Sequence, residues 1–224
     1  TGTELNVNKI DGQSGNYIVK SNVTLELGNV NNTNIFIENG GELTITNHWG
    51  IGDKVNIYVL NGGKFHYQSS NVDYNICIYK GATFDSTRNL YINSGKGIYI
   101  EGDWTTTADV DNRGNFYIGG DYNGSKFYPG AGTSYFAKDL TLINDVNADA
   151  PLYVGGNLKA QNLYFGSQVY IVGDVNISNN VYNTDTESAN VYIGGDLKCG
   201  DFKHNQGSTT NVQGENGLDL SKKD

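Results

Sequence analysis

The chain has 224 residues, is 37% hydrophobic and carries a formal net charge of −9, so it can bury a substantial core. Nucleic acids and anionic membranes are disfavoured partners, because only two residues are arginine and no basic cluster is visible. No apolar run reaches the roughly 18 residues of a membrane span. We therefore expect an uncharged partner and no membrane insertion.

Glycine and asparagine are abundant, with 30 and 31 residues, whereas there are only two prolines. Both residue types tolerate left-handed backbone, which indicates many tight corners. The two cysteines, Cys77 and Cys199, are not spaced like a disulfide framework. The chain begins at Thr1, shows no signal peptide and contains no methionine, so we expect a fragment or a processed chain whose anchor or export signal lies outside it.

In chain order, residues 1–20 are expected to form an N-terminal cap or first strand, and a repeated motif follows. Aligned on the residue between two apolar neighbours, the motif occurs nine times, with steps of 22, 19, 22, 18, 18, 18, 17 and 22 residues. One copy has Lys138 in place of the motif's glycine, and the regular step of 18 residues places it. The copies are IFIENGG around Phe36, IYVLNGG around Tyr58, ICIYKGA around Cys77, IYIEGDW around Tyr99, FYIGGDY around Tyr117, SYFAKDL around Tyr135, LYVGGNL around Tyr153, VYIVGDV around Tyr170 and VYIGGDL around Tyr192.

Each copy alternates apolar and other residues, as at Ile57 and Val59, which indicates a strand with one buried face. A second short alternating run often follows the glycine, as at Leu140 and Leu142, and no window has helical spacing. These repeats predict an all-β fold, a parallel β-helix of about nine to ten coils forming a rod of about 45 Å. We expect one domain over residues 1–224, with the polar residues 205–224 as a C-terminal cap or tail. A β-sandwich, the alternative, does not explain one motif recurring in register.

In a β-helix the aligned positions stack into one column, and strand alternation turns that column outward. Neighbouring rings on a sheet stabilise each other by roughly 0.2–1 kcal/mol per pair, so the column could simply hold the coils in register. We favour binding, because valine, threonine or isoleucine would serve that purpose too, and an exposed aromatic stripe is typical of an interaction site. The predicted carbohydrate-binding residues are Phe36, Tyr58, Tyr99, Tyr117, Tyr135, Tyr153, Tyr170 and Tyr192.

A flat stripe of ring faces would stack on the apolar faces of sugars, while the hydroxyl tips form hydrogen bonds. Two coils advance the column by roughly 9.6 Å, which is close to the disaccharide repeat of an extended β-1,4-glucan. We therefore expect a monomeric, non-catalytic, carbohydrate-binding adhesin domain that is extracellular or on a cell surface. Its expected partner is an insoluble plant polysaccharide, with cellulose first.

An acidic column follows the motif glycines and consists of Asp103, Asp121, Asp139, Asn157, Asp174 and Asp196. These side chains are expected to bond nearby backbone N–H groups at the turns. Calcium bridging the stacked carboxylates is the alternative, but the DxDxDG spacing of a dedicated calcium loop is absent. We expect no cofactor and no metal site.

The sequence contains no recognisable catalytic constellation, and we do not expect an enzyme. Asn183-Thr184-Asp185 reproduces the NTD tripeptide of polygalacturonase-like hydrolases, but the paired aspartates, Gly-His-Gly and Arg-x-Lys of that family are missing. The histidines His48, His66 and His204 lack ligand spacing and are expected at the surface or in turns. A lyase- or hydrolase-type β-helix is the further alternative.

Other solenoid classes provide a comparison. Ice-binding β-solenoids present Thr-x-Thr columns, which this chain lacks, whereas bactofilin-like filament proteins repeat short strands that VYIGGDL resembles. A structural, self-assembling solenoid without glycan binding is thus the alternative function. Over residues 35–200, the tyrosine-rich face, the repeats and the negative charge resemble the tapirins, cell-surface proteins that bind cellulose through a β-helical domain. That resemblance implies adhesion of a bacterium to plant biomass, with an anchor upstream of Thr1.

Overall fold

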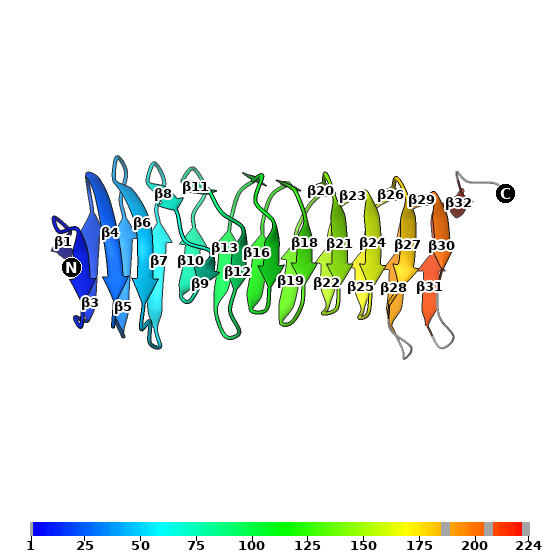
Figure 1. Cartoon of the computed structure of the whole chain (residues 1–224). Helices are drawn as coiled ribbons and strands as arrows, with labels where there is room; N and C mark the ends of the chain where they lie inside the picture. Colours follow the sequence, from blue (N-terminus) through cyan, green and yellow to red (C-terminus); the bar gives the residue numbers. More distant parts are fainter. Residues whose placement is uncertain (1, 185–188, 204–207, 221–224) are drawn as a thin grey trace.

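A computed structural model describes residues 2–184, 189–203 and 208–220, and the chain forms a rod of stacked coils (Figure 1). The described residues contain 32 strands, and neighbouring strands of each sheet run parallel. No helix long and apolar enough to cross a membrane occurs among the described residues. The all-β parallel fold is therefore confirmed, with about 11 turns rather than the nine to ten predicted.

Four sheets, which we name A to D, run along the rod. Sheet A contains β1 (Thr3–Glu4), β3 (Gly15–Val19), β5 (Thr33–Ile37), β7 (Val55–Val59), β10 (Asn75–Ile78), β13 (Gly97–Ile100), β16 (Asn115–Ile118), β19 (Thr133–Phe136), β22 (Leu152–Val154), β25 (Val169–Ile171), β28 (Asn190–Ile193) and β31 (Thr209–Val212). Sheet B contains β2 (Lys9–Asp11), β4 (Asn22–Gly28), β6 (Glu42–Trp49), β8 (Lys64–Tyr67) and β11 (Thr83–Ser86). Sheet C contains β9 (Asn71–Val72), β12 (Leu90–Ile92), β15 (Val110–Asn112), β18 (Phe127–Pro129), β21 (Asp145–Ala148), β24 (Asn162–Phe165), β27 (Asn180–Asn183) and β30 (Asp201–Lys203). Sheet D contains β14 (Trp104–Thr105), β17 (Tyr122–Gly124), β20 (Leu140–Leu142), β23 (Leu158–Ala160), β26 (Val175–Ile177), β29 (Leu197–Cys199) and β32 (Leu218–Leu220).

The cross-section of the rod changes along its length. Up to β8 the chain alternates between sheets A and B, and the B strands β4 and β6 have 7 and 8 residues. From β13 onward each coil visits sheets A, D and C in turn, with D strands of only 2 or 3 residues. We call residues 3–67 the two-sheet region and residues 97–220 the three-sheet region. Strands β9 to β12 connect them.

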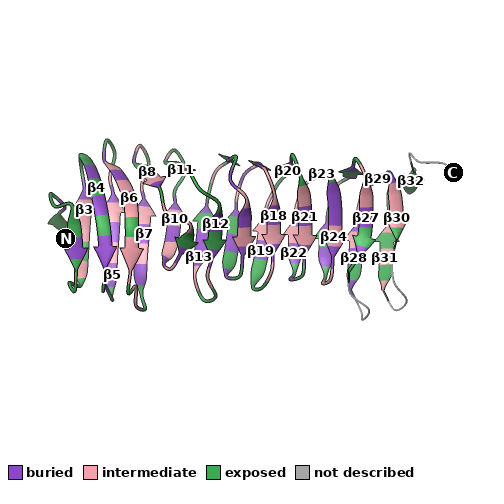
Figure 2. Ribbon diagram, in the orientation of Figure 1, coloured by how far each residue is buried: buried purple, intermediate pink, exposed green. Residues whose placement is uncertain are grey.

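Burial follows the alternation of the sequence. In β5 and β7 the first, third and fifth residues are buried, and the residues between them are partly exposed. Figure 2 shows the same alternation of buried and exposed residues along the rod. The buried apolar residues form one continuous core from Leu5 to Cys199. Each fully buried valine, leucine or isoleucine contributes about 1.5–3 kcal/mol, so this core provides most of the stability.

Aromatic side chains fill the core where sheet B ends and sheet D begins. Phe84 of β11 stacks on Trp104 of β14 with ring centroids 5.3 Å apart, and Trp104 packs on Tyr122 at 5.3 Å. The indole Nε1 of Trp104 donates to the backbone carbonyl of Phe84 at 3.0 Å. Trp104 therefore connects the last coil of sheet B to the first coil of sheet D.

Strands at both ends of the described chain pair with the sheets of the rod. In residues 1–20, β1 pairs with β3 and β2 pairs with β4, so this segment is the first coil. In residues 205–224, β31 and β32 continue sheets A and D in register. Residues 205–207 and 221–224 of that predicted cap or tail lie outside the described residues. Cys77 lies in sheet A and Cys199 in sheet D, and no disulfide joins them.

Candidate functional site

Strand pairing in sheet A brings all nine aligned motif positions into one column. The copy that carries Lys138 is in register as predicted, because Tyr135 pairs with both Tyr117 and Tyr153. The column also extends beyond the motif by two positions at its N-terminal end and by one at its C-terminal end. In order it contains Glu4, Ile18, Phe36, Tyr58, Cys77, Tyr99, Tyr117, Tyr135, Tyr153, Tyr170, Tyr192 and Asn211.

Most rings of this column stack on one another. Four consecutive contacts join five rings, with centroids 4.6–5.3 Å apart and ring planes within 2–6° of parallel. Phe36 and Tyr58 form a separate stacked pair at 5.0 Å. We call the five stacked rings the tyrosine ladder, which consists of Tyr117, Tyr135, Tyr153, Tyr170 and Tyr192.

Cys77 and Tyr99 separate the tyrosine ladder from the Phe36–Tyr58 pair. Cys77 supplies no ring. The Tyr99 ring lies over Gly97 of its own strand, because a Cβ on that glycine would come within 2.8 Å of the ring atom Cε2. Of the eight predicted binding residues, five therefore form one continuous surface, while Phe36, Tyr58 and Tyr99 lie in the same column outside it.

The tyrosine ladder presents ring edges and hydroxyl groups, which differs from the flat row of ring faces expected from the sequence. Parallel rings whose centroids are 4.6–5.3 Å apart overlap face to face, so each ring covers part of its neighbour. The edges remain accessible, since Tyr117 and Tyr170 are 38% and 42% exposed. At the end of the ladder, the Tyr192 hydroxyl donates to Gln213 Oε1 at 3.1 Å.

The phenol group of Tyr153, the central rung of the ladder, remains protonated at neutral pH. Desolvation, and then the neighbouring phenols of Tyr135 and Tyr170, raise the pKa of Tyr153 above its ordinary value. A tyrosine already has a pKa of about 10, so a further rise keeps the hydroxyl neutral. This phenol can therefore both donate and accept a hydrogen bond.

The residues beside the tyrosine ladder are also uncharged. The residues two before and two after each rung belong to the same strand or directly flank it, and all ten are exposed or partly exposed. Five rungs span about 19 Å along the rod. Together with the rungs, these residues form what we call the uncharged strip: Asn115, Thr133, Pro151, Gln168 and Asn190 on one side, and Gly119, Ala137, Gly155, Val172 and Gly194 on the other.

A ladder of asparagines in the N-terminal part of sheet A was not predicted. The Nδ2 groups of Asn34, Asn56 and Asn75 donate to Oδ1 of the asparagine one coil earlier, at 2.8, 2.9 and 3.0 Å, and the ladder begins at Asn16. These residues lie two positions before the aromatic column on the same face. The sequence does contain the signal, because asparagine recurs at this position in NIF, NIY and NIC.

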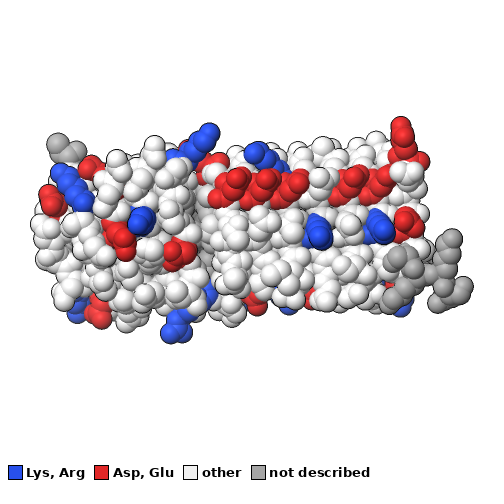
Figure 3. Space-filling view, turned by 90° about the horizontal axis from the view of Figure 1, so that it is seen from above, with Lys and Arg blue, Asp and Glu red and all other residues white. Residues whose placement is uncertain are grey.

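The aspartate column bonds backbone N–H groups, as predicted, but across coils rather than within one turn. Each side-chain Oδ1 accepts from a backbone N–H of the following coil, at 2.7–3.2 Å, and the acidic members form the row visible in Figure 3. Among the described residues, no group of three or more histidine, cysteine or acidic side chains could bind a metal ion. The acceptors are Asp103, Asp121, Asp139, Asn157, Asp174 and Asp196.

These hydrogen bonds explain the glycine that precedes the aspartate in the motif. A Cβ on Gly195 would collide with Oδ1 of Asp174 in the preceding coil. Gly102, in the first copy of the column, would meet nothing within 4 Å. Where Lys138 replaces the glycine, the adjacent hydrogen bond, from the N–H of Asp139 to Asp121 Oδ1, is the longest of the column at 3.2 Å.

The histidine prediction is wrong for His48, whose side chain is only 3% exposed. Its Nε2 lies 2.9 Å from Asp73 Oδ2, because a buried imidazole requires a polar partner. His66 is 29% exposed, and its Nδ1 lies 2.6 Å from Asp85 Oδ2. His204, and Asp185 of the NTD tripeptide, lie outside the described residues.

A second column of outward tyrosines, in sheet C, was also missed. Its members occur in short stretches such as LYI, FYP and LYF, each with the tyrosine between two buried residues. No repeated motif marks this column, because tyrosine is absent from some of its coils. Its members are Tyr91, Tyr128, Tyr164 and Tyr182.

Comparisons of the chain with protein-family profiles, with curated proteins and with solved structures found no match. The fold and surface therefore define the class: a parallel β-solenoid with a stacked aromatic ladder on one flat face.

Proposed function

We propose that this protein is a non-catalytic binding module that attaches to an insoluble, uncharged polysaccharide, with cellulose as the expected ligand. The observation that carries this proposal is the uncharged strip around the tyrosine ladder, in a chain whose formal charge is −9. Charged groups hold water and would have to be desolvated against a neutral solid. A strip without them suits a flat surface of sugar hydroxyl and C–H groups.

The hydroxyl edge of the ladder is the proposed contact. Phenol groups supply donors and acceptors, and the amides of Gln168 and Asn190 beside the rungs add more. Rungs recur about every 4.8 Å, so two of them match the disaccharide repeat of an extended β-1,4-glucan. Ring stacking fixes the hydroxyl row before binding, which lowers the entropy lost on attachment.

Attachment to a solid polysaccharide fits a role outside the cell. We propose an extracellular or cell-surface location and an adhesive role, as the resemblance to the tapirins implies. The rod would lie with its sheet A face against the solid.

A pull-down on microcrystalline cellulose tests this proposal. Replacing Tyr135, Tyr153 and Tyr170 by phenylalanine retains the stacked rings but removes three hydroxyls, and we expect at least a tenfold loss of bound protein. Alanine at Tyr117, Tyr135 and Tyr153 should abolish binding. The control, Lys159→Ala with Lys198→Ala, changes exposed residues of sheet D and should bind like the parent. Unchanged binding by both tyrosine variants would contradict the proposal.

The stacked geometry also favours a second candidate, a structural solenoid in which the ladder only stabilises the coils. Each offset-stacked pair contributes about 0.5–1.5 kcal/mol, which is a sufficient reason for the tyrosines to be present. This candidate predicts no affinity for glucans and concentration-dependent assembly of rods. Light scattering over a range of protein concentrations, run beside the pull-down, separates the two candidates.

A further inference from the structure

The second tyrosine column, on sheet C, differs from the tyrosine ladder because polar residues separate its first three rings. Tyr91 pairs with Asp111, and Asp111 pairs with Tyr128. Phe127 pairs with Val146, which aligns Tyr128 with Asn147, and Asn147 pairs with Tyr164. From Tyr91 to Tyr164, tyrosines therefore occur at every second coil, about 9.6 Å apart, whereas Tyr164 and Tyr182 occupy successive coils. The column in order is Tyr91, Asp111, Tyr128, Asn147, Tyr164 and Tyr182.

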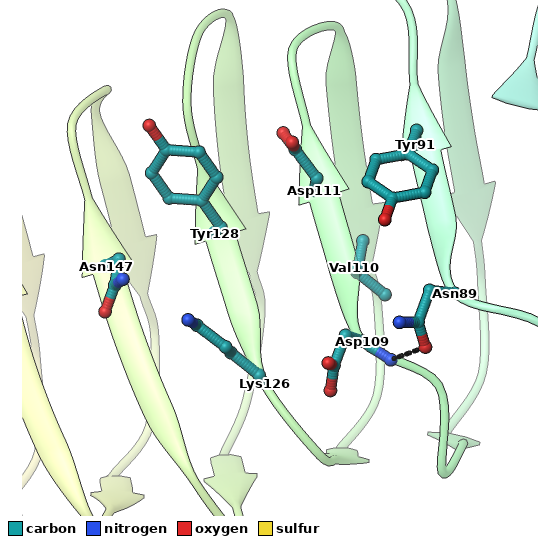
Figure 4. A pocket seen from close by; sticks show the side chains of 8 residues that line it. All are labelled: Asn89, Tyr91, Asp109, Val110, Asp111, Lys126, Tyr128 and Asn147. Atoms are coloured by element: carbon teal, nitrogen blue, oxygen red, sulfur yellow. Dashed lines mark hydrogen bonds between the residues drawn. The ribbon is translucent and has the colours of Figure 1, made fainter. Parts of the chain in front are cut away.

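The spaces between these rings are open. A cavity of about 260 Å³, which we call the sheet C groove, is lined by Tyr91, Asp111, Tyr128 and Asn147 together with four neighbours. Figure 4 shows the rings of Tyr91 and Tyr128 on either side of Asp111. Tyr91 is 45% exposed, so its ring is accessible to a ligand. A separate, smaller cavity of about 120 Å³ on the same sheet is lined by Tyr164 and Tyr182 together with four neighbours.

Two buried acceptor atoms lie on the polar residues of the groove. Oδ1 of Asp111 and Oδ1 of Asn147 have no hydrogen-bond partner among the described residues. Arg113 Nε lies 3.5 Å from Asp111 Oδ1, which is an ion-pair distance but too long for a good N–H···O bond. Buried acceptors are normally satisfied, so two residues that line the groove have hydrogen-bonding capacity that the described residues do not use.

The Tyr128 ring is fixed in position before any ligand binds. Its hydroxyl donates to Asp149 Oδ2 of the following coil at 2.7 Å. The ring also lies beside Gly130, where a Cβ would come within 3.1 Å of the ring atom Cε1. A rigid ring loses little entropy on binding, which is typical of a built recognition site.

We propose that the sheet C groove binds a single, uncharged sugar chain, with one pyranose unit between Tyr91 and Tyr128. The C–H groups of this sugar pack against the two rings, and its hydroxyls donate to the Asp111 carboxylate between them, whereas the Asn147 amide, one coil beyond Tyr128, contacts a later sugar of the same chain. Tyr91, Tyr128 and Tyr164, about 9.6 Å apart, then contact alternate sugars of an extended chain. Asp109, Asp111 and Asp149 outnumber Lys126 and Arg113 around the groove, so a chain of uronic acids is disfavoured.

This inference does not depend on the proposed function of the tyrosine ladder. Sheets A and C are different faces of the rod, and they share no outward residue. The ladder is proposed to attach to a solid through hydroxyl edges, whereas the groove takes one soluble chain between separated rings. Either proposal can fail alone.

Isothermal titration calorimetry with soluble hexasaccharides tests the groove. Cellohexaose, xylohexaose and mannohexaose are the uncharged probes, and hexagalacturonate is the charged counterpart. We expect at least one uncharged probe to bind, and hexagalacturonate to bind at least tenfold more weakly than the best of them. The absence of binding by all three uncharged probes would overturn the proposal.

Variants connect that binding to the groove. Tyr91→Ala and Asp111→Ala should each weaken binding at least tenfold. Tyr79→Ala is the matched control, because Tyr79 is 40% exposed and lies outside the groove, and it should not change the affinity. Circular dichroism checks that each variant is folded, and the exposed Tyr91 can be removed without opening the core. Full affinity in Tyr91→Ala contradicts the groove even if Asp111→Ala unfolds.

The tyrosine-to-phenylalanine ladder variant separates the two proposals. It should lose cellulose pull-down and retain hexasaccharide binding, whereas Tyr91→Ala should show the reverse. If the ladder variant loses hexasaccharide binding while Tyr91→Ala retains it, the groove is not the site.

Discussion

The two-sheet and three-sheet regions form one rod by different local means. In the two-sheet region, two long strands make each coil, glycines with positive φ such as Gly40 and Gly62 form corners, and asparagines bond from coil to coil. In the three-sheet region, short strands make each coil, aspartates form the column at one corner, and tyrosine rings stack. Sheet A runs through both regions. On its outer face, hydrogen-bonded asparagine side chains form the ladder in the two-sheet region, and stacked tyrosine rings form the ladder in the three-sheet region.

The corners of the two regions follow a common rule. A Cβ on Gly62 would collide with Oδ1 of Asn39, just as one on Gly195 would collide with Oδ1 of Asp174. In both regions a side-chain oxygen of one coil occupies the space above a glycine of the next. The glycine is therefore required by the neighbouring coil, and positive φ is an additional requirement only at Gly62.

The largest effect is expected at the junction of the two regions. Trp104→Ala removes a buried ring and its hydrogen bond to Phe84, and we expect it to lower the free energy of unfolding by about 3–5 kcal/mol. Chemical denaturation followed by circular dichroism should then show two transitions, since the regions lose their main connection. A single transition, with the stability unchanged, would contradict the role of this indole.

The corner rule is tested by two alanine substitutions at the same motif position. Gly195→Ala forces a Cβ into Asp174 Oδ1 and should destabilise the protein by about 1–3 kcal/mol. Gly102→Ala is the matched control, because nothing lies within 4 Å of its Cβ. Thermal unfolding should distinguish the two, and equal effects would show that backbone conformation, not the oxygen above, selects glycine.

The two ladders of sheet A can be compared by removing one central rung from each. Tyr153→Ala loses two stacked contacts and should lower the free energy of unfolding by about 1–2 kcal/mol. Asn56→Ala loses two amide hydrogen bonds and should lower it by about 1 kcal/mol. Urea denaturation measures both, and a neutral Tyr153→Ala would leave binding as the only explanation for the ladder.

The smallest effect concerns acid at the C-terminal coil. The side-chain amide and then the backbone N–H of Asn216 hydrogen-bond to Asp196 and lower its pKa below the ordinary value. This stabilisation is fully present above the unfolded-state pKa of about 3.9 and is lost as the pH falls through the lower folded-state value. NMR signals of Thr209–Val212 should weaken below about pH 4, and Asp196→Asn should make them less sensitive to acid.

Much of the fold follows from the sequence because its repeats specify register directly. The regular step placed Tyr135 correctly even though Lys138 breaks the motif, since a parallel β-helix keeps equivalent residues in one column. The change of cross-section was not predicted, because strand alternation gives buried faces but not the number of corners in a coil.

The surface was harder to predict. Alternation turns Tyr153 outward, but the plane of its ring depends on the rings one coil away, so face-to-face stacking was missed. The sheet C column was not predicted, because Asp111 and Asn147 occupy two of its coils and no single residue type recurs along it. His48 was assigned to the surface because its partner, Asp73, lies 25 residues away.

The aspartate column gives the rod a direction. The Oδ1 atom of each column residue accepts a hydrogen bond from a backbone N–H group of the following coil. Each coil therefore presents an acceptor to the next coil at the same position. The coils of the three-sheet region are in this sense interchangeable modules. Inserting a copy of residues 136–153 after Tyr153 would add one step of 18 residues and lengthen the rod by about 4.8 Å. The length of the rod can thus change in whole coils, with the same kinds of contact repeated at the inserted coil.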